Sequence, residues 1–397
     1  MDLSPAQGNL TRRLRRHIIG PTHSVYVVTT PGLETVCLTE LKALQIGHQP
    51  ILAGKGLILF GGRLNDIYEA NLHLSTANRV LMQAGEFTAP NLGALRDKAI
   101  RFPWELYLGP QTGVTVRVRS SRTPLFHSGA VAQQVDEAIA IRLAQHSVPV
   151  PTLPDQRPLQ MVLLRVQGTT CSIFIDSSGE LLYRRGLKTH GGRAPLRESV
   201  AAAILRLCDF RPQEVLLDPM CGSGTFALEA AMQASGIAPG WFRHFAFEKW
   251  PAFRPATWQY IRRQAEWNPG TRPKLKVHAS DVDAGTVGRL KTSVSKTPLS
   301  GAINTLTADF FKLLPTQFSA TGGVILINPP YGKRLQEKSS TADLYRRIGR
   351  KLTADFAGWR LGLVVPDKQV LKALPFSGAV HGFSHGGDQR WFLIAKI

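Results

Sequence analysis

The sequence contains few cysteines, no long hydrophobic run and too few acidic residues to balance its basic ones. The cysteines are Cys37, Cys171, Cys208 and Cys221. Because none of them forms a Cys-x-x-Cys pair, we expect no metal site and no disulfide framework, and the chain suits a reducing compartment such as the cytoplasm. No apolar run approaches the roughly 20 residues of a membrane-spanning helix, and no secretion signal or membrane partner is expected.

The shortage of acidic residues is the strongest signal in the composition. The chain has 397 residues, with 48 Lys and Arg against 28 Asp and Glu, which gives a net charge of +20. An enzyme for small neutral molecules does not need that excess. The charge therefore favours a polyanionic partner, nucleic acid before a membrane surface. The length allows two or three domains, each with its own core.

The first part of the chain predicts a basic arm followed by a small α+β unit. Residues 1–22 include the basic run "TRRLRRHI", and we expect them to form a flexible arm, with part of an organelle presequence as the alternative. Residues 23–88 contain strand-like runs at 23–30 and 55–62. Between them, leucines at helical spacing over 33–47 predict a helix.

Residues 89–182 predict a second small unit. The run at 113–122 is a strand whose valines alternate with Arg117 and Arg119, so the two arginines share one face of it. Helices are expected at 92–102 and 129–146, and a hairpin around Gly168 at 159–179.

A basic linker at 183–194 joins these units to the rest of the chain. Together with Arg197 just beyond it, the linker carries Arg184, Arg185, Lys188 and Arg193, with no acid before Glu198. A solvated connector and a nucleic-acid contact are equally compatible with this pattern.

Strands and helices alternate from 195 to 397, as a parallel sheet with crossover helices requires. Strands are expected at 214–218, 274–281, 303–309, 322–328, 360–366 and 390–397, and helices at 195–208, 225–235, 283–294 and 341–356. This order predicts a doubly wound α/β domain, in which ligands bind beyond the carboxyl ends of the strands.

The first strand end carries a glycine turn, "LLDPMCGSGTF", at 216–226. Gly222 and Gly224 would let the backbone approach a ligand closely, at the free N–H groups of the next helix. The turn has neither a Gly-x-Gly-x-x-Gly fingerprint nor the Gly-Lys-Ser/Thr of a phosphate-binding loop. A plain tight turn is the alternative.

Acidic residues close the next two strands. Asp281 could accept hydrogen bonds from both hydroxyls of a ribose, and Asp283 is the better candidate for capping the following helix. Asp309 could accept a hydrogen bond from an adenine amine, and an ordinary turn aspartate is the alternative.

The fourth strand end reads "LINPPYGKRL" at 326–335. Two adjacent prolines have no N–H to donate, so the strand must stop at Asn328 and the chain must stiffen there. The sequence thus fixes one amide, Asn328, and one aromatic ring, Tyr331, at the end of a buried strand, next to a pocket suited to an adenosine ligand.

At this point the sequence resembles a known family. "DPMCGSGT" followed by "NPPYG" is similar to class I S-adenosylmethionine (SAM)-dependent methyltransferases that modify exocyclic amines of nucleobases. Segments such as "PGLETVCLTELKAL", "VRVRSSRTPLFHSGAVAQQVDEAI" and "RRGLKTHGGRAPLRES" resemble the bacterial THUMP-containing branch. That branch includes guanine-N2 methyltransferases of large-subunit ribosomal RNA, often labelled adenine-N6-specific DNA methylases. The resemblance covers nearly the whole chain from about residue 23.

The resemblance implies an architecture and a set of site residues. The fold would be a ferredoxin-like unit at 23–88, a THUMP-like RNA-binding domain at 89–182 and a Rossmann-like methyltransferase domain at 195–397. The implied target clamp is Asn328, Pro329, Pro330 and Tyr331. The implied SAM-binding residues are Asp218, Pro219, Cys221, Gly222, Gly224, Thr225, Asp281, Asp309 and Asn328.

Several functions fit this resemblance. Guanine-N2 methylation of RNA leads, with 23S ribosomal RNA (rRNA) preferred over tRNA and bound through the THUMP-like domain and the basic linker. Adenine-N6 methylation of DNA or RNA is the alternative, because the clamp suits either amine, and a non-catalytic RNA-binding factor is a third reading. An aromatic-rich insertion at 238–270 either stacks on RNA or, as we expect for most of its rings, packs against the sheet.

Overall fold

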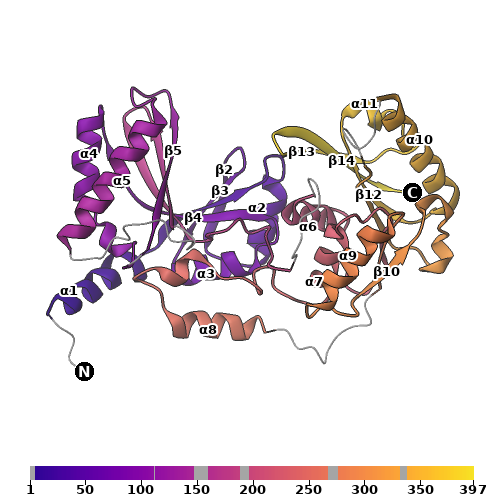
Figure 1. The fold of residues 1–397 in the computed structure, drawn as a ribbon, viewed down its shortest axis with the longest axis horizontal. Helices are drawn as coiled ribbons and strands as arrows, with labels where there is room; N and C mark the ends of the chain where they lie inside the picture. Colours follow the sequence, from indigo (N-terminus) through magenta and orange to yellow (C-terminus); the bar gives the residue numbers. More distant parts are fainter. Residues whose placement is uncertain (1–4, 111, 147–159, 188–195, 267–275, 331–337) are drawn as a thin grey trace.

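Two seven-stranded sheets organise the protein, one built from residues 23–176 and one from residues 216–396 (Figure 1). The computed structural model describes residues 5–110, 112–146, 160–187, 196–266, 276–330 and 338–397. In this part of the chain no helix is long and apolar enough to cross a membrane. The four cysteines are all buried free thiols.

The N-terminal sheet has the strand order β2-β3-β1-β4-β7-β6-β5. Its strands are β1 (His23–Thr29), β2 (His48–Gly54), β3 (Leu57–Gly62), β4 (Ala77–Thr88), β5 (Val114–Ser121), β6 (Gln160–Gln167) and β7 (Thr170–Asp176). Its helices are α2 (Glu34–Ala43), α3 (Leu64–His73), α4 (Leu92–Arg101) and α5 (Ser128–Gln145), with the short turn η2 (Trp104–Leu106). The predicted strands, helices and hairpin are all present. Strand β2 was not predicted, because it holds Pro50 and is exposed along most of its length.

One long strand, β4, joins the two small units that the sequence predicted. Its first half pairs with β1 as far as Met82, and from Leu81 onwards it pairs with β7. The α+β unit and the unit that follows it therefore share a single sheet.

The prediction of a flexible N-terminal arm is wrong for residues 5–19. They form helix α1 (Pro5–Leu14) and the helical turn η1 (Arg15–Ile19), and Ile18 is fully buried. Arg13 donates to Glu105 at 2.7 Å, and Glu105 also pairs with Arg142. The basic residues that suggested a solvated arm are thus partly neutralised by a buried acid 92 positions away in the sequence.

The C-terminal sheet has the order β10-β9-β8-β11-β12-β14-β13. Its strands are β8 (Leu216–Asp218), β9 (Val277–Asp281), β10 (Ile303–Thr307), β11 (Val324–Ile327), β12 (Arg360–Val365), β13 (Ala379–His385) and β14 (Asp388–Lys396). Its helices are α6 (Glu198–Leu207), α7 (Thr225–Ala234), α9 (Ala284–Ser295), α10 (Lys338–Asp355) and α11 (Lys368–Leu371). The first five strands in this order run parallel, and β14 and β13 are antiparallel.

Helices cover both faces of this sheet, which confirms the predicted doubly wound α/β fold. Leu216 and Val324 face the core shared with α6, α7 and α9, whereas Leu217 and Ile325 face the core shared with α10. Neighbouring residues along each buried strand are apolar because both faces are covered. Strand β13 and helix α11 were not predicted.

The aromatic-rich insertion packs against the N-terminal lobe. It contains the turn η3 (Ala246–Lys249) and helix α8 (Pro255–Gln264), which lies near α3 in Figure 1. Phe247 stacks on Tyr68 of α3 with ring centroids 4.4 Å apart, and Trp258 is also buried in this core. Packing is thus confirmed for most rings, but against α3 and the N-terminal core. Tyr260 remains 63% exposed.

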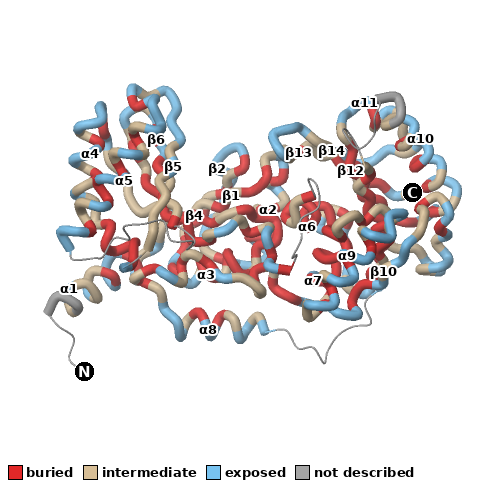
Figure 2. The backbone as a smooth tube through the Cα atoms, in the orientation of Figure 1, coloured by how far each residue is buried: buried red, intermediate tan, exposed pale blue. Residues whose placement is uncertain are grey.

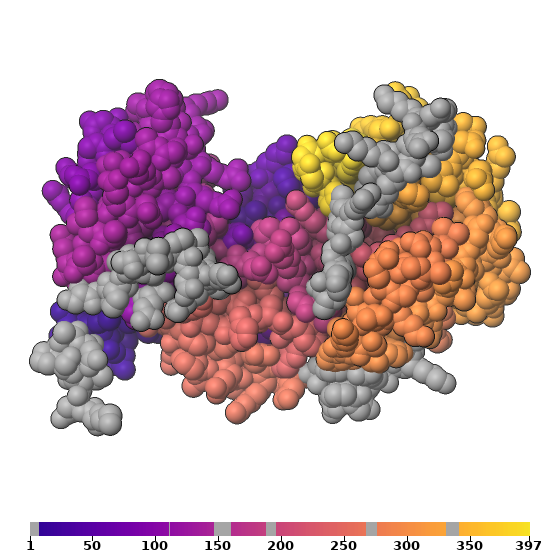
Figure 3. All heavy atoms as spheres, viewed as in Figure 1, coloured from indigo at the N-terminus to yellow at the C-terminus, as the bar shows by residue number. Residues whose placement is uncertain are grey.

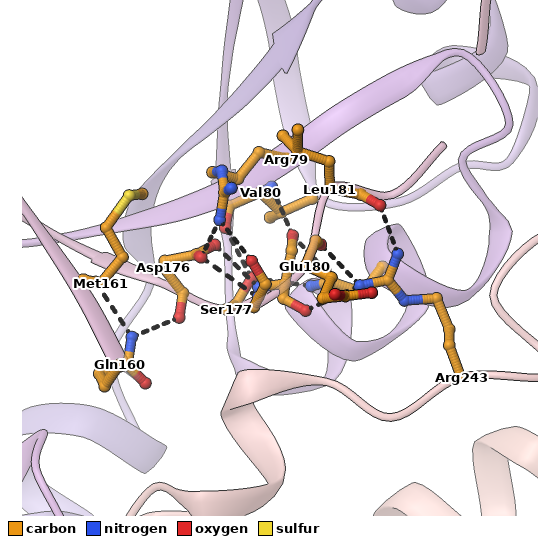
Figure 4. Close-up of polar contacts among 12 residues, drawn as sticks. Arg79, Val80, Gln160, Met161, Asp176, Ser177, Glu180, Leu181 and Arg243 are labelled. Carbon is orange, nitrogen blue, oxygen red and sulfur yellow. Dashed lines mark hydrogen bonds and ion pairs between the residues drawn. The ribbon is translucent and has the colours of Figure 1, made fainter. Parts of the chain in front are cut away.

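A polar network fastens the insertion to the end of β7 (Figure 4). Arg243 donates to the carbonyl oxygens of Leu181 at 2.8 Å and Glu180 at 2.6 Å. Next to it, Arg79 of β4 pairs with the buried Asp176 of β7. Burial and the nearby charge of Arg185 lower the pKa of Arg243 to about 10, so it stays protonated near neutral pH.

Ion pairs with a buried carboxylate hold the two lobes together in the region of α2 and α6, where Figure 2 shows buried segments. Glu40 of α2 accepts a hydrogen bond from Arg206 of α6 at 2.6 Å and from the Ser75 N–H at 2.8 Å. Arg185, from the basic linker, is buried and donates to Glu229 of α7 at 3.0 Å. This linker arginine is therefore structural. Lys188 and Arg193 lie outside the described residues.

Candidate functional site

The predicted site residues that the structure describes lie at the carboxyl edge of the C-terminal sheet. Strands β10, β9, β8 and β11 are parallel neighbours, so their carboxyl ends lie side by side. The chain runs outward from β8 through β9 to β10 and then returns on the other side of β8 with β11. This reversal of order makes the β8–β11 boundary the switch point at which α/β sheets bind ligands.

The glycine turn between β8 and α7 is tied to the end of β9. The Cys221 N–H donates to the Ser280 carbonyl at 2.9 Å, and the Gly224 N–H donates to the Cys221 carbonyl at 2.7 Å. Gly222 and Gly224 have φ angles of 51° and 73°, in the left-handed region that favours glycine. The sequence did not identify Ser280, whose carbonyl carries this link.

The two glycines are required for different reasons. A Cβ on Gly224 would lie 2.4 Å from Leu290 Cδ1 of α9, whereas a Cβ on Gly222 would meet no atom within 4 Å. Gly224 is thus fixed by packing, and Gly222 borders open space. That open space is where a ligand could approach the backbone.

Alanine at these two positions should give contrasting results. Gly224→Ala should lower the free energy of unfolding by about 1–3 kcal/mol, because it adds backbone strain and a clash with Leu290. Gly222→Ala carries only the backbone strain, but its methyl group enters the space proposed for SAM. We expect a larger loss of SAM affinity than of stability. Thermal denaturation and calorimetry on both variants check this, and equal losses of stability would contradict it.

Asp281 holds the turn from the end of β9. Its Oδ2 accepts a hydrogen bond from the Gly222 N–H at 3.0 Å, and its Oδ1 accepts one from the Asp283 N–H at 3.0 Å. Each carboxylate oxygen has a second lone pair that could accept a hydrogen bond from a ligand hydroxyl. Asp283 caps α9 by accepting from the Gly285 N–H at 2.9 Å, as predicted.

Asp309 follows β10, and backbone contacts of the two residues before it place it close to Asp281. Thr307 pairs with Asp281, and the Ala308 N–H donates to the Asp281 carbonyl at 3.0 Å. The Asp309 carboxylate accepts from the Phe311 N–H at 3.0 Å, which is the turn role named as the alternative. A contact with an adenine amine stays a prediction.

Cys221 is buried between the carboxylates that flank the turn. Burial raises the pKa of its thiol, and the charges of Asp218 and Asp281 raise it further. The thiol therefore remains protonated and is no nucleophile. Asp218, Pro219 and Thr225 are buried around the same turn.

Asn328 lies just beyond β11, which ends at Ile327, one residue before the stop at Asn328 that the two prolines predicted. Pro329 is buried and Pro330 is half-buried. Asn328 Oδ1 is buried, and within the described residues it accepts no hydrogen bond. A buried acceptor without a donor is destabilising, and this oxygen is free to accept a hydrogen bond. Tyr331 lies outside the described residues.

Two family profiles match the chain. The profile described as the RMKL-like methyltransferase domain matches residues 185–380. The profile described as the RlmL ferredoxin-like domain matches residues 24–81. The second match covers β1 to β3 and the start of β4, and the first covers the glycine turn and the Asn-Pro-Pro segment.

Curated relatives extend this similarity over most of the chain. The protein slr0064 of Synechocystis sp., named as a candidate RNA methyltransferase, is 30% identical over 357 residues, 89% of this chain and 91% of the relative. The ribosomal RNA large subunit methyltransferase K/L of Methylococcus capsulatus is 31% identical over 86% of this chain. That alignment covers 47% of the relative, so the chain spans about half the length of this longer protein.

Solved structures have the same fold over nearly their whole length. SMU.472, a candidate methyltransferase complexed with SAH, has a TM-score of 0.83 at 25% identity and covers 95% of this chain and 99% of its own. A predicted N6-adenine-specific DNA methylase from Listeria monocytogenes has a TM-score of 0.80 at 26% identity, over 94% and 96%. TrmN from Thermus thermophilus has a TM-score of 0.69 at 26% identity, over 94% and 99%. With its ferredoxin-like N-terminal domain and its glycine turn and Asn-Pro-Pro segment at one sheet edge, the chain belongs to the RMKL-like methyltransferase family.

Proposed function

We propose that this chain is a SAM-dependent RNA methyltransferase that methylates N2 of guanine in 23S rRNA. One observation carries the proposal most directly. Asn328 places a buried oxygen without a described donor at the switch point, just beyond β11, the neighbour of the strand that leads into the glycine turn. An acceptor in that position suits an amine whose hydrogens must be held while its nitrogen is methylated.

The residues at the sheet edge fit SAM. Gly222 borders open space, Asp281 has free lone pairs suited to ribose hydroxyls, and Asp309 lies beside Asp281 for the adenine amine. SAM, when bound, supplies an electrophilic methyl group on a sulfonium. SMU.472 was crystallised with SAH, which supports the same class of ligand here.

The role of Asn328 and Pro329 follows from the weakness of the nucleophile. The lone pair of an exocyclic amine is delocalised into the purine ring, so the nitrogen is planar and unreactive. Hydrogen bonds from the amine to Asn328 Oδ1 and to the Pro329 carbonyl draw the nitrogen towards tetrahedral geometry. The two prolines hold both acceptors in place beforehand, so catalysis comes mainly from positioning.

No strong base is needed in this scheme, because the methylated nitrogen loses its proton readily. Cys221 is excluded as a base since burial and two neighbouring carboxylates keep it protonated. The target base must leave its helix or loop to reach the site, and Tyr331 is expected to stack on it.

An RNA substrate is supported by the charge of the chain and by its relatives. The net charge is +20, and the K/L relative is named a ribosomal RNA large subunit methyltransferase. We propose that residues 89–182 act as the THUMP-like RNA-binding domain. Methyl transfer from labelled SAM to unmodified 23S rRNA, with tRNA as the comparison, tests the proposal. Transfer to tRNA alone would overturn the rRNA assignment.

A second candidate is adenine-N6 methylation. One relative of known structure is described as a predicted N6-adenine-specific DNA methylase, and the acceptors of Asn328 and Pro329 suit an adenine amine equally. Labelled SAM with duplex DNA separates the two: transfer to DNA would favour this candidate. A non-catalytic role is disfavoured by the intact glycine turn and Asn328.

Asp281→Ala should weaken SAM binding by about 1.5–3 kcal/mol, the scale of hydrogen bonds to a charged group. The variant loses the proposed ribose acceptor and the hydrogen bond that holds Gly222. Asp283→Ala is the matched control, because it removes a neighbouring carboxylate that only caps α9. Calorimetry with SAM on the full chain measures both. Wild-type affinity in Asp281→Ala would place the ribose elsewhere.

A further inference from the structure

Many arginines of the described residues pair with carboxylates. These are Arg13, Arg79, Arg142, Arg185, Arg206 and Arg360, among others. Other arginines are exposed and have no carboxylate within ion-pair distance among the described residues. Four of these lie on strands β5 and β6 or directly after β5. They are Arg117, Arg119, Arg122 and Arg165, which we call the basic strip.

Strand register places Arg117, Arg119 and Arg165 on one face of the sheet, and Arg122 directly follows the end of β5. β5 and β6 are parallel neighbours in which Arg119 pairs directly with Arg165. The valines that alternate with Arg117 and Arg119 pack into the core under α4 and α5. The arginines therefore point away from those helices, on the face that they leave uncovered.

Exposed aromatic rings extend the basic strip beyond the end of β5. Phe126, in the loop between β5 and α5, is 66% exposed, and its ring centroid lies 4.2 Å from that of His127, which is also exposed. Phe126 thus offers a ring face to the solvent, shortly after Arg122 of the basic strip in the sequence. Aromatic and basic side chains together form the platform that unpaired bases stack on.

Acidic residues are absent from this stretch, since residues 113–128 contain no Asp or Glu. On the same face of the sheet, Glu86 of β4 is separated from Arg165 by strand β7, whose Ser172 donates to it at 2.7 Å. The basic strip therefore has a sharp border towards the middle of the sheet.

A hollow separates the lobe that carries the basic strip from the C-terminal domain, which carries the proposed SAM site. Figure 3 shows this hollow between the purple lobe, which contains β5 and α5, and the yellow part of the C-terminal domain, where β13 lies in Figure 1. Helix α11 follows the carboxyl end of β12, which is parallel to β11, and it rises on the far side of the hollow in Figure 1. An RNA strand bound at β5 would have to cross the hollow to reach the carboxyl edge of the C-terminal sheet.

We infer that the basic strip and Phe126 bind a single-stranded RNA segment next to the target nucleotide. Arg117, Arg119 and Arg165 contact successive phosphates, and an unpaired base stacks on Phe126. The inference rests on the proposed RNA substrate and adds the surface that holds it. Because the basic strip lies on the other lobe from Asn328, it anchors the RNA while the target base enters the site.

The test compares two triple variants of the full chain. Arg117→Gln, Arg119→Gln and Arg165→Gln together remove three charges from the basic strip. Arg263→Gln, Lys291→Gln and Lys296→Gln remove three exposed charges from α8, α9 and the residue that follows α9. The probe is a fluorescently labelled single-stranded 30-nucleotide RNA, and fluorescence anisotropy measures its affinity at several salt concentrations.

The basic-strip variant should bind the probe about tenfold or more weakly near 0.1 M salt, and the slope of log affinity against log salt should fall by about 2. Phe126→Ala should weaken binding by about 5- to 100-fold with an unchanged slope. The control variant should bind as wild type does, and all variants should keep the wild-type melting temperature.

Equal losses in both triple variants would overturn the inference, since they would show general attraction to a basic protein. A wild-type chain that binds no RNA would also overturn it and leave an acidic protein as the partner of this surface. Failure of the proposed function looks different. There, the wild-type chain binds RNA through the basic strip but transfers no methyl group to 23S rRNA.

Discussion

Replacing Asn328 by alanine should lower kcat by about 100-fold or more while the protein stays folded, because it removes one preorganised contact made chiefly as the amine changes geometry. SAM affinity should stay within about a factor of three, since Asn328 lies beyond the proposed ribose and adenine contacts. Stability should not fall, because the lost oxygen is buried and accepts no hydrogen bond within the described residues. Single-turnover methyl transfer, calorimetry and thermal denaturation measure the three quantities.

Asn91→Ala is the matched control for this experiment. Asn91 caps α4 by accepting a hydrogen bond from the Ala94 N–H at 2.9 Å, far from the C-terminal sheet in sequence. Its loss should reduce stability by about 1 kcal/mol and leave kcat unchanged. If Asn328→Ala behaved like Asn91→Ala, with lower stability and normal kcat, Asn328 would be an ordinary turn residue.

RNA affinity should fall by about 10²- to 10⁵-fold between 50 and 200 mM salt, as expected for several phosphate contacts. The reason is the net charge of +20, part of which lies in exposed arginines of β5 and β6 that have no carboxylate partner among the described residues. Filter binding of 23S rRNA to the full chain over this range gives the slope.

SAM binding provides the internal reference for the salt experiment. It involves no phosphate, so its affinity should change little over the same salt range. An RNA affinity that changed by less than about tenfold would mean that fewer phosphates are contacted than we propose.

The sequence identified the parts of the fold and site that local chemistry decides. The two prolines after Asn328 predicted the end of β11 to within one residue, and Asp283 was correctly assigned as the cap of α9. Alternation of buried strands with helices predicted the doubly wound sheet. These features depend on residues close together in the chain, so a local pattern is enough to reveal them.

Features that depend on distant partners were not predictable. The N-terminal segment is helical because Ile18 is buried in the core and Arg13 forms an ion pair with Glu105. A basic run in the sequence does not reveal either of these distant contacts. The sequence of the basic linker indicated an exposed charge at Arg185, but this residue is buried in an ion pair with Glu229.

Gly224 shows the same limit within the site. Glycine at this position is required by Leu290 of α9, which is 66 positions away in the sequence, so packing accounts for this part of the glycine turn.

The most direct test of the central claim is mass spectrometry of nucleosides from 23S rRNA of cells that lack the gene for this chain. We predict that N2-methylguanosine falls by one residue per 23S rRNA and returns when the wild-type gene is restored, but not when Asn328→Ala is. Unchanged N2-methylguanosine together with loss of N6-methyladenosine from any nucleic acid would contradict the account.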